Sequence, residues 1–530
     1  MFGLHSLFDR QDDALSVISG VEAGLREQLV SGLSGSSRTV FMASIYKQTG
    51  KAMLIITHNL LQAQKLYDDL ERLLGEDEVL LYPANELIAA EMSIASPEMR
   101  AQRIEVLNHW SAGKKGIVIA PVAGIRKLLP PVALWKKFQL HIKVGEDVDV
   151  DDLLVKFTAM GYSRSEMVSA PGEFSVRGGI IDIYPLTEEN PIRIELFDTE
   201  VESIRTFSID DQRSRQKLKE TRIGPATEIP MEKAHYQLAA KRLEEGLAKS
   251  LKKVKSEETK TLLSQNLGYE LEKLKNEQKP DELFKYISLV YEKENNLVNY
   301  LPEEGLIFID EISRVQEMSD SLDREEADWY TALLEEGKII HDLTVAHSLH
   351  DALQKSSRSI VYLSLFLRHV PNTNPQNIIN ISCKQMQNFH GQMHVLKTEL
   401  ERWKKGNFAV IFLGADKKRM EHLERVLGDY GVETVTLPAK GQILPGTVQI
   451  AEGDLHTGFE LPIQKVAVIT ERELFNKKAK RRPRRQKLSN AERIKSYSEL
   501  KVGDYVVHVN HGIGKYLGIE TLEINGVHKD

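Results

Sequence analysis

Short apolar runs alternate with amphipathic stretches along the first 125 residues. Residues 52–57, 79–83 and 116–120 form three such runs, and residues 61–74 between the first two have helical spacing. Strands of a parallel sheet show continuous apolar runs of this kind because helices cover both faces of the sheet. A similar run at residues 306–311 lies far downstream. We therefore predict an α/β domain whose sheet receives strands from distant parts of the chain.

The pattern changes between residues 128 and 215. Residues 174–185 and 191–197 alternate between polar and apolar positions and are rich in β-branched side chains. Period-two alternation is typical of antiparallel strands with one solvated face. We predict that these residues form an α+β domain inserted into the first domain, which would then consist of residues 1–127 and 216–350. The part at residues 216–350 includes charged helices.

A second α/β pattern occupies residues 351–470. Its candidate strands are residues 408–413, 433–437 and 466–470, and residues 417–427 are a candidate helix. The chain is long enough for several cores of about 150 residues each. The predicted fold class is thus multidomain α/β, with a small second α/β domain after the first.

A basic segment separates this domain from the end of the chain. Residues 471–497 contain eight lysines and arginines within eleven positions. Blocks of like charge repel one another and usually form solvated linkers. The alternative is a linker that also contacts nucleic-acid phosphates, through Lys480, Arg481, Arg482, Arg484 and Arg485.

Residues 498–530 alternate again and predict the start of a small β-barrel. Asn525-Gly526 is a strong signal for a two-residue hairpin turn. We expect its second strand to lie beyond Asp530, which would make the chain a fragment. Two histidines, His508 and His511, are too few to indicate a metal site, and no metal ligand is assigned.

Composition excludes several classes of protein. The net charge of −7 argues against nucleic-acid affinity over the whole surface of a 530-residue chain. The single cysteine, Cys383, excludes an internal disulfide and a cysteine-rich zinc site. No apolar run approaches the length of a membrane span, and the N-terminus lacks the pattern of a secretory signal. We expect a cytoplasmic protein without membrane contact.

Residues 32–39 resemble an altered phosphate-binding loop. Set against G-x-x-x-x-G-K-[ST], this segment, which also includes Gly35, matches at Gly32 and Thr39. Ser37 replaces the second glycine and Arg38 replaces the lysine. A planar guanidinium does not reproduce the compact charge of lysine on the terminal phosphates. Thr39 could still bind magnesium.

Asp310 and Glu311 follow an apolar run, as the acidic pair of helicase-like ATPases does. We predict a degenerate P-loop fold in which no residue is catalytic and no cofactor is bound. Weak nucleotide binding and true hydrolysis remain alternatives, and a lysine at position 38 would favour hydrolysis.

Residues 172–185, GEFSVRGGIIDIYP, resemble a segment shared by the excision-repair helicase UvrB and the coupling-factor family Mfd. The resemblance continues in the same order through residues 192–198 and 202–205. In both families this inserted domain binds UvrA. The resemblance therefore implies a UvrA-binding domain at residues 128–215.

Residues 500–516, LKVGDYVVHVNHGIGKY, resemble the polymerase-interacting domain of the Mfd family, which is related to CarD-type barrels with a Tudor-like fold. UvrB has no such domain, and its phosphate loop is intact. The chain is therefore identified as similar to Mfd-type coupling factors of low-GC Gram-positive bacteria, over essentially its whole length. The first domain would then be RecA/helicase-like.

The resemblance also implies which residues bind partners. For UvrA these are Arg164, Arg177, Arg193 and Glu195, with salt bridges inside the domain as the alternative. Phe174 and Phe197 are expected in the core. For the RNA polymerase β subunit they are Thr521, Leu522 and Glu523, and Leu522 could instead belong to the barrel core.

The implied function is transcription-coupled nucleotide excision repair. This segment would recruit UvrA to RNA polymerase stalled at lesions, as a monomer. The parent would be an ATP-dependent DNA translocase whose lobes, with their ATP, Mg2+ and main contact to double-stranded DNA, follow Asp530. A helicase-like ATPase, or a duplex-DNA-binding module acting in DNA repair, is the alternative.

Overall fold

The computed structural model describes residues 3–9, 11–85, 97–209, 211–354, 356–438, 441–475, 505–508, 512–515, 522–524 and 527–529. They belong to two compact units, Met1–Lys487 and Leu488–Asp530. Within these described ranges, no helix has the length and apolar character needed to cross a membrane.

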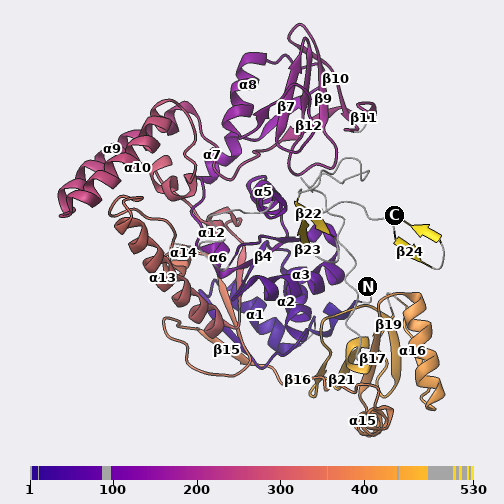
Figure 1. The fold of residues 1–530 in the computed structure, drawn as a ribbon. Coiled ribbons are helices and arrows are strands. Elements are labelled where there is room, and N and C mark those ends of the chain that lie inside the picture. The colour runs from indigo at the N-terminus through magenta and orange to yellow at the C-terminus, as the bar shows by residue number, and fades with distance from the viewer. Residues whose placement is uncertain are drawn as a thin grey trace. The chain divides into compact units, whose positions relative to one another are not determined.

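A seven-stranded parallel sheet forms the centre of the first α/β domain (Figure 1). The strand order is β15-β1-β14-β13-β2-β4-β3. The strands are β1 Glu27–Ser31, β2 Met53–Thr57, β3 Val79–Leu81, β4 Ile117–Pro121, β13 Leu306–Asp310, β14 Ile360–Ser364 and β15 Asn377–Asn380. All four apolar runs form strands of this sheet, so the predicted sheet is confirmed. The distant run at residues 306–311 forms the central strand β13.

Helices pack around this sheet because its strands are buried on both faces. They are α1 Asp12–Glu22, α2 Ser37–Thr49, α3 Leu60–Leu74, α5 Pro97–Ser111, α6 Val122–Ile125, α7 Val132–Lys137, α12 Leu297–Tyr300, α13 Ile312–Glu335 and α14 Leu349–Gln354. The boundary predicted at residue 350 falls before β14 and β15. The first sheet therefore extends to Asn380, because parallel pairing with β1 recruits two strands from beyond that boundary.

The inserted domain contains a six-stranded sheet of order β11-β10-β9-β8-β7-β6. Its pairings are antiparallel except for that of β6 with β7. The elements are α8 Val150–Ala159, β6 Ser163–Arg164, β7 Glu173–Arg177, β8 Ile180–Ile183, β9 Ile192–Phe197, β10 Glu200–Phe207 and β11 Ser214–Leu218. A separate ribbon joins β5 Leu140–Lys143 to β12 Glu220–Ile223, so the domain continues past the predicted end at residue 215.

Two long helices follow the inserted domain, as the charged sequence of residues 231–300 predicts. These are α9 Lys233–Lys253 and α10 Glu257–Lys275, which pack against each other. Their apolar faces bury a separate core that includes Leu243, Leu263 and Leu267. The pair therefore has its own hydrophobic core beside that of the sheet.

The small α/β domain has a mixed sheet of order β16-β20-β21-β17-β19-β18. Its elements are β16 Lys384–Gln385, α15 Met393–Lys405, β17 Ala409–Gly414, α16 Lys417–Asp429, β18 Val435–Thr436, β19 Val448–Glu452, β20 Phe459–Leu461, β21 Val466–Thr470 and α17 Glu471–Leu474. The predicted strands and helix are present, although the strand expected at 433–437 is only two residues long. Ile411, Phe459 and Val468 belong to the same buried cluster as Val30 of β1. One face of the small domain's sheet therefore shares a core with the first domain, whereas Phe412 and Ile469 belong to a separate core of the small domain.

The second unit consists, in its described residues, of two antiparallel ribbons. The first pairs β22 Tyr505–His508 with β23 Gly512–Lys515. The second pairs β24 Leu522–Ile524 with β25 Val527–Lys529 across a two-residue connection. The hairpin's second strand was expected beyond Asp530. That expectation is wrong, because β25 supplies the strand within the chain.

Candidate functional site

The inserted domain presents one polar face and one apolar face of its sheet. Ile181, Ile192 and Ile194 are buried. On the same side, Phe174 of β7 packs against Phe157 of α8 with ring centroids 5.4 Å apart. The intervening residues face the other way, because successive side chains in a strand alternate between faces. Phe174 therefore lies in the core, as predicted.

Asp182 of β8 is the centre of the polar face. Its carboxylate, 1% exposed, accepts from Arg193 at 2.7 Å (Nε to Oδ1) and 2.9 Å (Nη2 to Oδ2). Arg177 donates to the same Oδ2 at 3.1 Å. One buried carboxylate thus binds Arg177 and Arg193, two of the three arginines that the resemblance indicated, and the predicted alternative of internal salt bridges describes their geometry.

The two arginines differ in what remains available to a partner. The Arg193 side chain is only 15% exposed, and its guanidinium lies 4.5 Å from the ring centroid of Phe207. Its hydrogen bonds to Asp182 raise its pKa. The Arg177 side chain is 52% exposed and shares a single N–H with Asp182. Arg193 is therefore a structural residue that binds the buried Asp182, whereas Arg177 projects into solvent.

Glu195 and Phe197 extend the same face along β9. Glu195 accepts a hydrogen bond from Ser203 and forms an ion pair with Arg205. Phe197 is 75% exposed, so the prediction that it belongs to the core is wrong. Strand alternation from Arg193 and Glu195 places Phe197 on the polar face. Arg164 is exposed at the end of β6.

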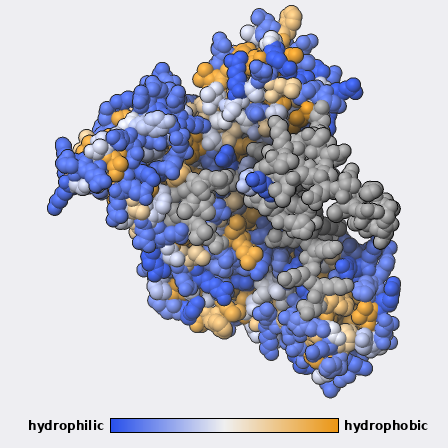
Figure 2. All heavy atoms as spheres, in the orientation of Figure 1, coloured by the Kyte–Doolittle hydropathy of each residue, from blue (hydrophilic) through white to orange (hydrophobic). Residues whose placement is uncertain are grey.

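The surface of the inserted domain is mixed rather than uniformly polar. In Figure 2 this domain, at the top of the view, carries hydrophobic patches between hydrophilic ones. Large apolar side chains exposed in this domain include Phe197, Val155 and Met167. By strand alternation, Phe197 lies on the same face of the sheet as Arg177. Protein interfaces are enriched in exposed aromatic and arginine side chains of this kind.

The altered phosphate loop connects β1 to α2. Gly32 and Gly35 both have left-handed backbone, with φ of 91° and 55°. A Cβ at Gly35 would lie 2.6 Å from Thr457 Oγ1, so the small α/β domain reaches this loop. Thr39 is buried and donates to Ser36 O at 2.7 Å. The hydroxyl that could have bound magnesium therefore has a protein partner.

Arg38 and the acidic pair lie together, as the motif order predicts. Arg38 Nη1 donates to Asp310 Oδ1 at 2.7 Å and lies 3.4 Å from Glu311 Oε1. Gln62 donates to the other oxygen of Asp310 at 3.1 Å. Burial raises the pKa of Glu311 although Arg38 opposes the shift. Both oxygens of Asp310 thus have protein partners, and the arginine occupies the position of the missing lysine.

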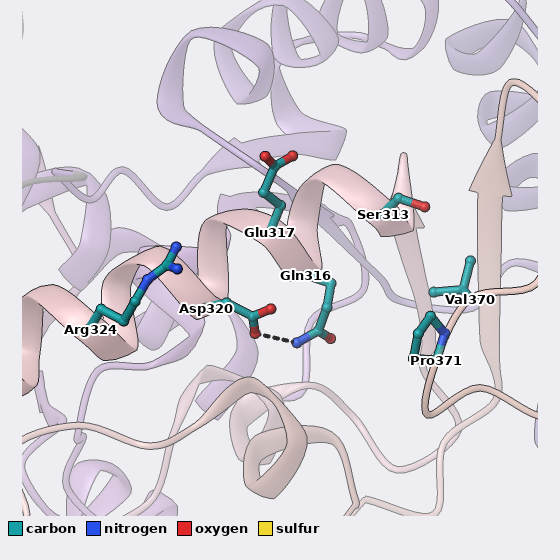
Figure 3. A pocket seen from close by; sticks show the side chains of 7 residues that line it. All are labelled: Ser313, Gln316, Glu317, Asp320, Arg324, Val370 and Pro371. Atoms are coloured by element: carbon teal, nitrogen blue, oxygen red, sulfur yellow. Dashed lines mark hydrogen bonds between the residues drawn. The ribbon is translucent and has the colours of Figure 1, made fainter.

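A cavity of about 410 Å³ lies along α13, the helix that directly follows Asp310 and Glu311 (Figure 3). Its lining is polar along the helix and apolar at Val370 and Pro371. Gln316 donates to Asp320 at 2.8 Å across its floor. We assign no chemistry to this cavity.

The remaining predicted site residues lie mostly outside the described residues. These are Lys480, Arg481, Arg482, Arg484, Arg485 and Thr521. Leu522 and Glu523 belong to β24, of which only the backbone is described. Their predicted contacts with nucleic acid and polymerase stay predictions.

Two segments match known domain families. Residues 140–229 match the UvrB interaction domain, and residues 500–530 match the CarD-like/TRCF RID domain. The first match covers the sheet that carries Asp182, Arg177 and Phe197. It begins at the first residue of β5 and ends shortly after β12.

The whole chain is similar to curated proteins called transcription-repair-coupling factor. The one from Bacillus subtilis (strain 168) is 54% identical over 530 residues, which are 100% of this chain and 45% of the relative. That of Staphylococcus haemolyticus (strain JCSC1435) is 39% identical over 520 residues, 96% of this chain and 43% of the relative. That of Staphylococcus aureus (strain USA300) is 37% identical over the same shares. The chain spans less than half the length of these relatives.

Proposed function

Because this chain belongs to the transcription-repair-coupling factor (Mfd) family, of which it represents the N-terminal region, we propose that it acts in transcription-coupled nucleotide excision repair. Its role is to recruit UvrA to RNA polymerase stalled at DNA lesions. The observation that carries this proposal is that Arg177 and Phe197 are both exposed on the polar face of a UvrB-type interaction domain.

The polar face suits a partner surface with carboxylates around an apolar hollow. Arg177 offers N–H groups that Asp182 does not use, and guanidinium groups pair well with carboxylates. Phe197 offers an aromatic anchor that is 75% exposed. Glu195 already forms an ion pair with Arg205, so it is not expected to form a further ion pair with UvrA. Its negative charge would instead help to orient the partner during association.

Polymerase docking belongs to the second unit. Residues 500–530 match the CarD-like/TRCF RID domain, and β24 is a short strand within that match. Strand addition to an exposed sheet edge is a common mode of protein recognition. We propose that Thr521, Leu522 and Glu523 contact the RNA polymerase β subunit in this way.

The parent protein's motor activity lies outside these modules in our proposal. The parent is an ATP-dependent DNA translocase, and this segment binds neither ATP nor Mg2+. Support comes from the side-chain partners of Arg38, Thr39 and Asp310.

The decisive experiment titrates the chain with UvrA. Arg177→Ala and Phe197→Ala should each weaken binding by about 1–3 kcal/mol, as for central interface residues. Matched controls are Arg222→Ala, an exposed arginine on β12, and Val155→Ala, an apolar residue of α8 that is 68% exposed. The controls should bind as the unchanged chain does.

Arg193→Ala separates docking from domain stability. Arg193→Ala removes the main ion-pair partner of the buried Asp182 carboxylate. This change should therefore lower the denaturation midpoint of the inserted domain as well as UvrA affinity. Equal affinities for the unchanged chain and both Arg177→Ala and Phe197→Ala would refute the docking face.

A further inference from the structure

The former phosphate loop is filled by a segment from the small α/β domain. Residues 453–458 leave the end of β19 and enter β20, and they meet the loop between β1 and α2. The two segments are 421 positions apart at the contact of Ser36 with Thr457. Figure 1 shows the small domain, in orange, beside the indigo elements of the first domain.

The contact is reciprocal at the backbone. Ser36 N donates to Thr457 Oγ1 at 3.0 Å, and Thr457 N donates to Ser36 Oγ at 3.1 Å. Phosphate loops bind anions through backbone N–H groups of this kind at the start of a helix. Here a threonine hydroxyl accepts from one of them. Its close approach to Gly35 also fills the space in front of the loop.

Other amides of the loop also have protein acceptors. Gly32 N donates to Ser364 O at 3.0 Å, and Ser37 N donates to Ser34 O at 3.3 Å. Ser34 N donates to Ser37 Oγ at 3.1 Å. The hydroxyl of Ser37, which replaces a motif glycine, thus forms a hydrogen bond within the loop, with the backbone amide of Ser34.

Asp69 of α3 joins the two segments from the side. Its carboxylate is buried and accepts from Ser36 Oγ at 2.6 Å and from His456 N at 2.8 Å. The His456 ring nitrogen Nδ1 lies 2.9 Å from the same oxygen, Oδ1. Nearby, Arg72 of α3 forms an ion pair with Asp454 at 2.6 Å. Two residues of the segment 453–458, Asp454 and His456, therefore bind two residues of one helix.

We propose that the altered loop has become an internal binding site whose ligand is the segment 453–458 of the same chain. The segment takes an N–H group and the space that phosphate would need, and it joins the small domain to the first domain. Two features thus exclude nucleotide: Arg38 replaces the phosphate-binding lysine, and the segment 453–458 occupies the loop. On this proposal a lysine at position 38 does not restore the site by itself.

The first test measures Mg-ATP binding to the full 530-residue chain. We expect no binding by Arg38→Lys alone. Binding by this variant at the affinity of an ordinary ATPase would overturn the proposal, because the loop would then have to be open.

The second test measures coupling across the contact. Ser36→Ala, Thr457→Val and the double variant are compared by hydrogen–deuterium exchange of the amides in residues 33–39. Each single change should speed exchange by about tenfold, and the double variant should be no faster than the faster single one. Multiplicative effects, or unchanged exchange, would overturn the proposal.

Thr447→Val is the matched control for this series. Its hydroxyl donates to Leu444 O at 2.8 Å inside the small domain, away from the loop. Exchange in residues 33–39 should not change in this variant. Circular dichroism of every variant shows whether the fold is retained, and the milder Ser36→Ala change preserves the test if Thr457→Val does not fold.

Discussion

Glu228 shows what one buried carboxylate contributes at the base of the inserted domain. It follows β12 and pairs with Arg103 of α5 at 2.8 Å, where the arginine side chain is 1% exposed. Lys127 lies 3.6 Å away on the other oxygen. Burial disfavours the charged carboxylate, but the charges of Arg103 and Lys127 outweigh it and lower the pKa of Glu228 from 4.5 to about 2. This cluster joins the inserted domain to the first α/β domain.

Acid should therefore weaken this anchor. A carboxylate with a lowered folded-state pKa stabilises above its unfolded pKa, and the contribution is lost as pH falls from 4.5 towards about 2. The contribution is at most about 3 kcal/mol. Urea midpoints between pH 7 and pH 3 should fall more steeply for the unchanged chain than for Glu228→Gln.

The same variant should already be less stable at pH 7. Glu228→Gln leaves the Arg103 charge buried with a neutral partner, which destabilises by about 2–3 kcal/mol. Parallel pH profiles for the two proteins would show that the pairing contributes nothing.

At the scale of elements, helices α9 and α10 contain two interior glycines with different surroundings. A Cβ at Gly268 of α10 would meet nothing within 4 Å. A Cβ at Gly246 of α9 would press on the side chain of Ile340. Glycine in a helix interior is less favourable than alanine by about 1 kcal/mol, so the surroundings decide the effect of substitution.

Gly268→Ala should stabilise the helix pair by about 0.5–1 kcal/mol. Amide exchange in α10 should slow by about two- to fivefold, since opening becomes rarer. Gly246→Ala is the matched comparison and should give a smaller gain or a loss, because Ile340 has to move. A larger gain for Gly246→Ala would contradict this account of the packing.

At the scale of the whole molecule, charge is distributed unevenly. The chain carries 70 basic and 77 acidic residues, a net charge of −7, yet residues 477–487 are almost entirely basic. This balance argues against nucleic-acid affinity over the whole surface. Any duplex-DNA affinity of this chain should therefore depend on the basic segment, through counterion release.

Replacing Arg481, Arg482, Arg484 and Arg485 by glutamine should reduce DNA binding and its salt dependence. The slope of log affinity against log salt should become shallower by up to about 0.9 for each lost phosphate contact. The matched control replaces four exposed lysines near α9, Lys241, Lys249, Lys252 and Lys255, with the same change in net charge. Equal slopes for both variants would show that only net charge matters.

Local patterns in the sequence predicted most elements correctly. The apolar runs at 52–57, 116–120 and 306–311 became adjacent strands, because strands buried on both faces need no polar positions. The alternation at 191–197 became β9. Boundaries were less accurate: β14 and β15 join the first sheet through pairing with β1, and pairing between distant strands leaves no local mark.

The sequence by itself determined the family, the alternating polar face that includes Arg177, and the loss of the phosphate-loop lysine, because these depend on residue identity and spacing. Only the tertiary structure decided that Arg193 binds the buried Asp182, that Phe197 is exposed and that Thr457 fills the altered loop. Each of these depends on which distant side chain comes within hydrogen-bonding or packing distance. Such proximity is set by the packing of the whole chain, which neither periodicity nor a motif encodes.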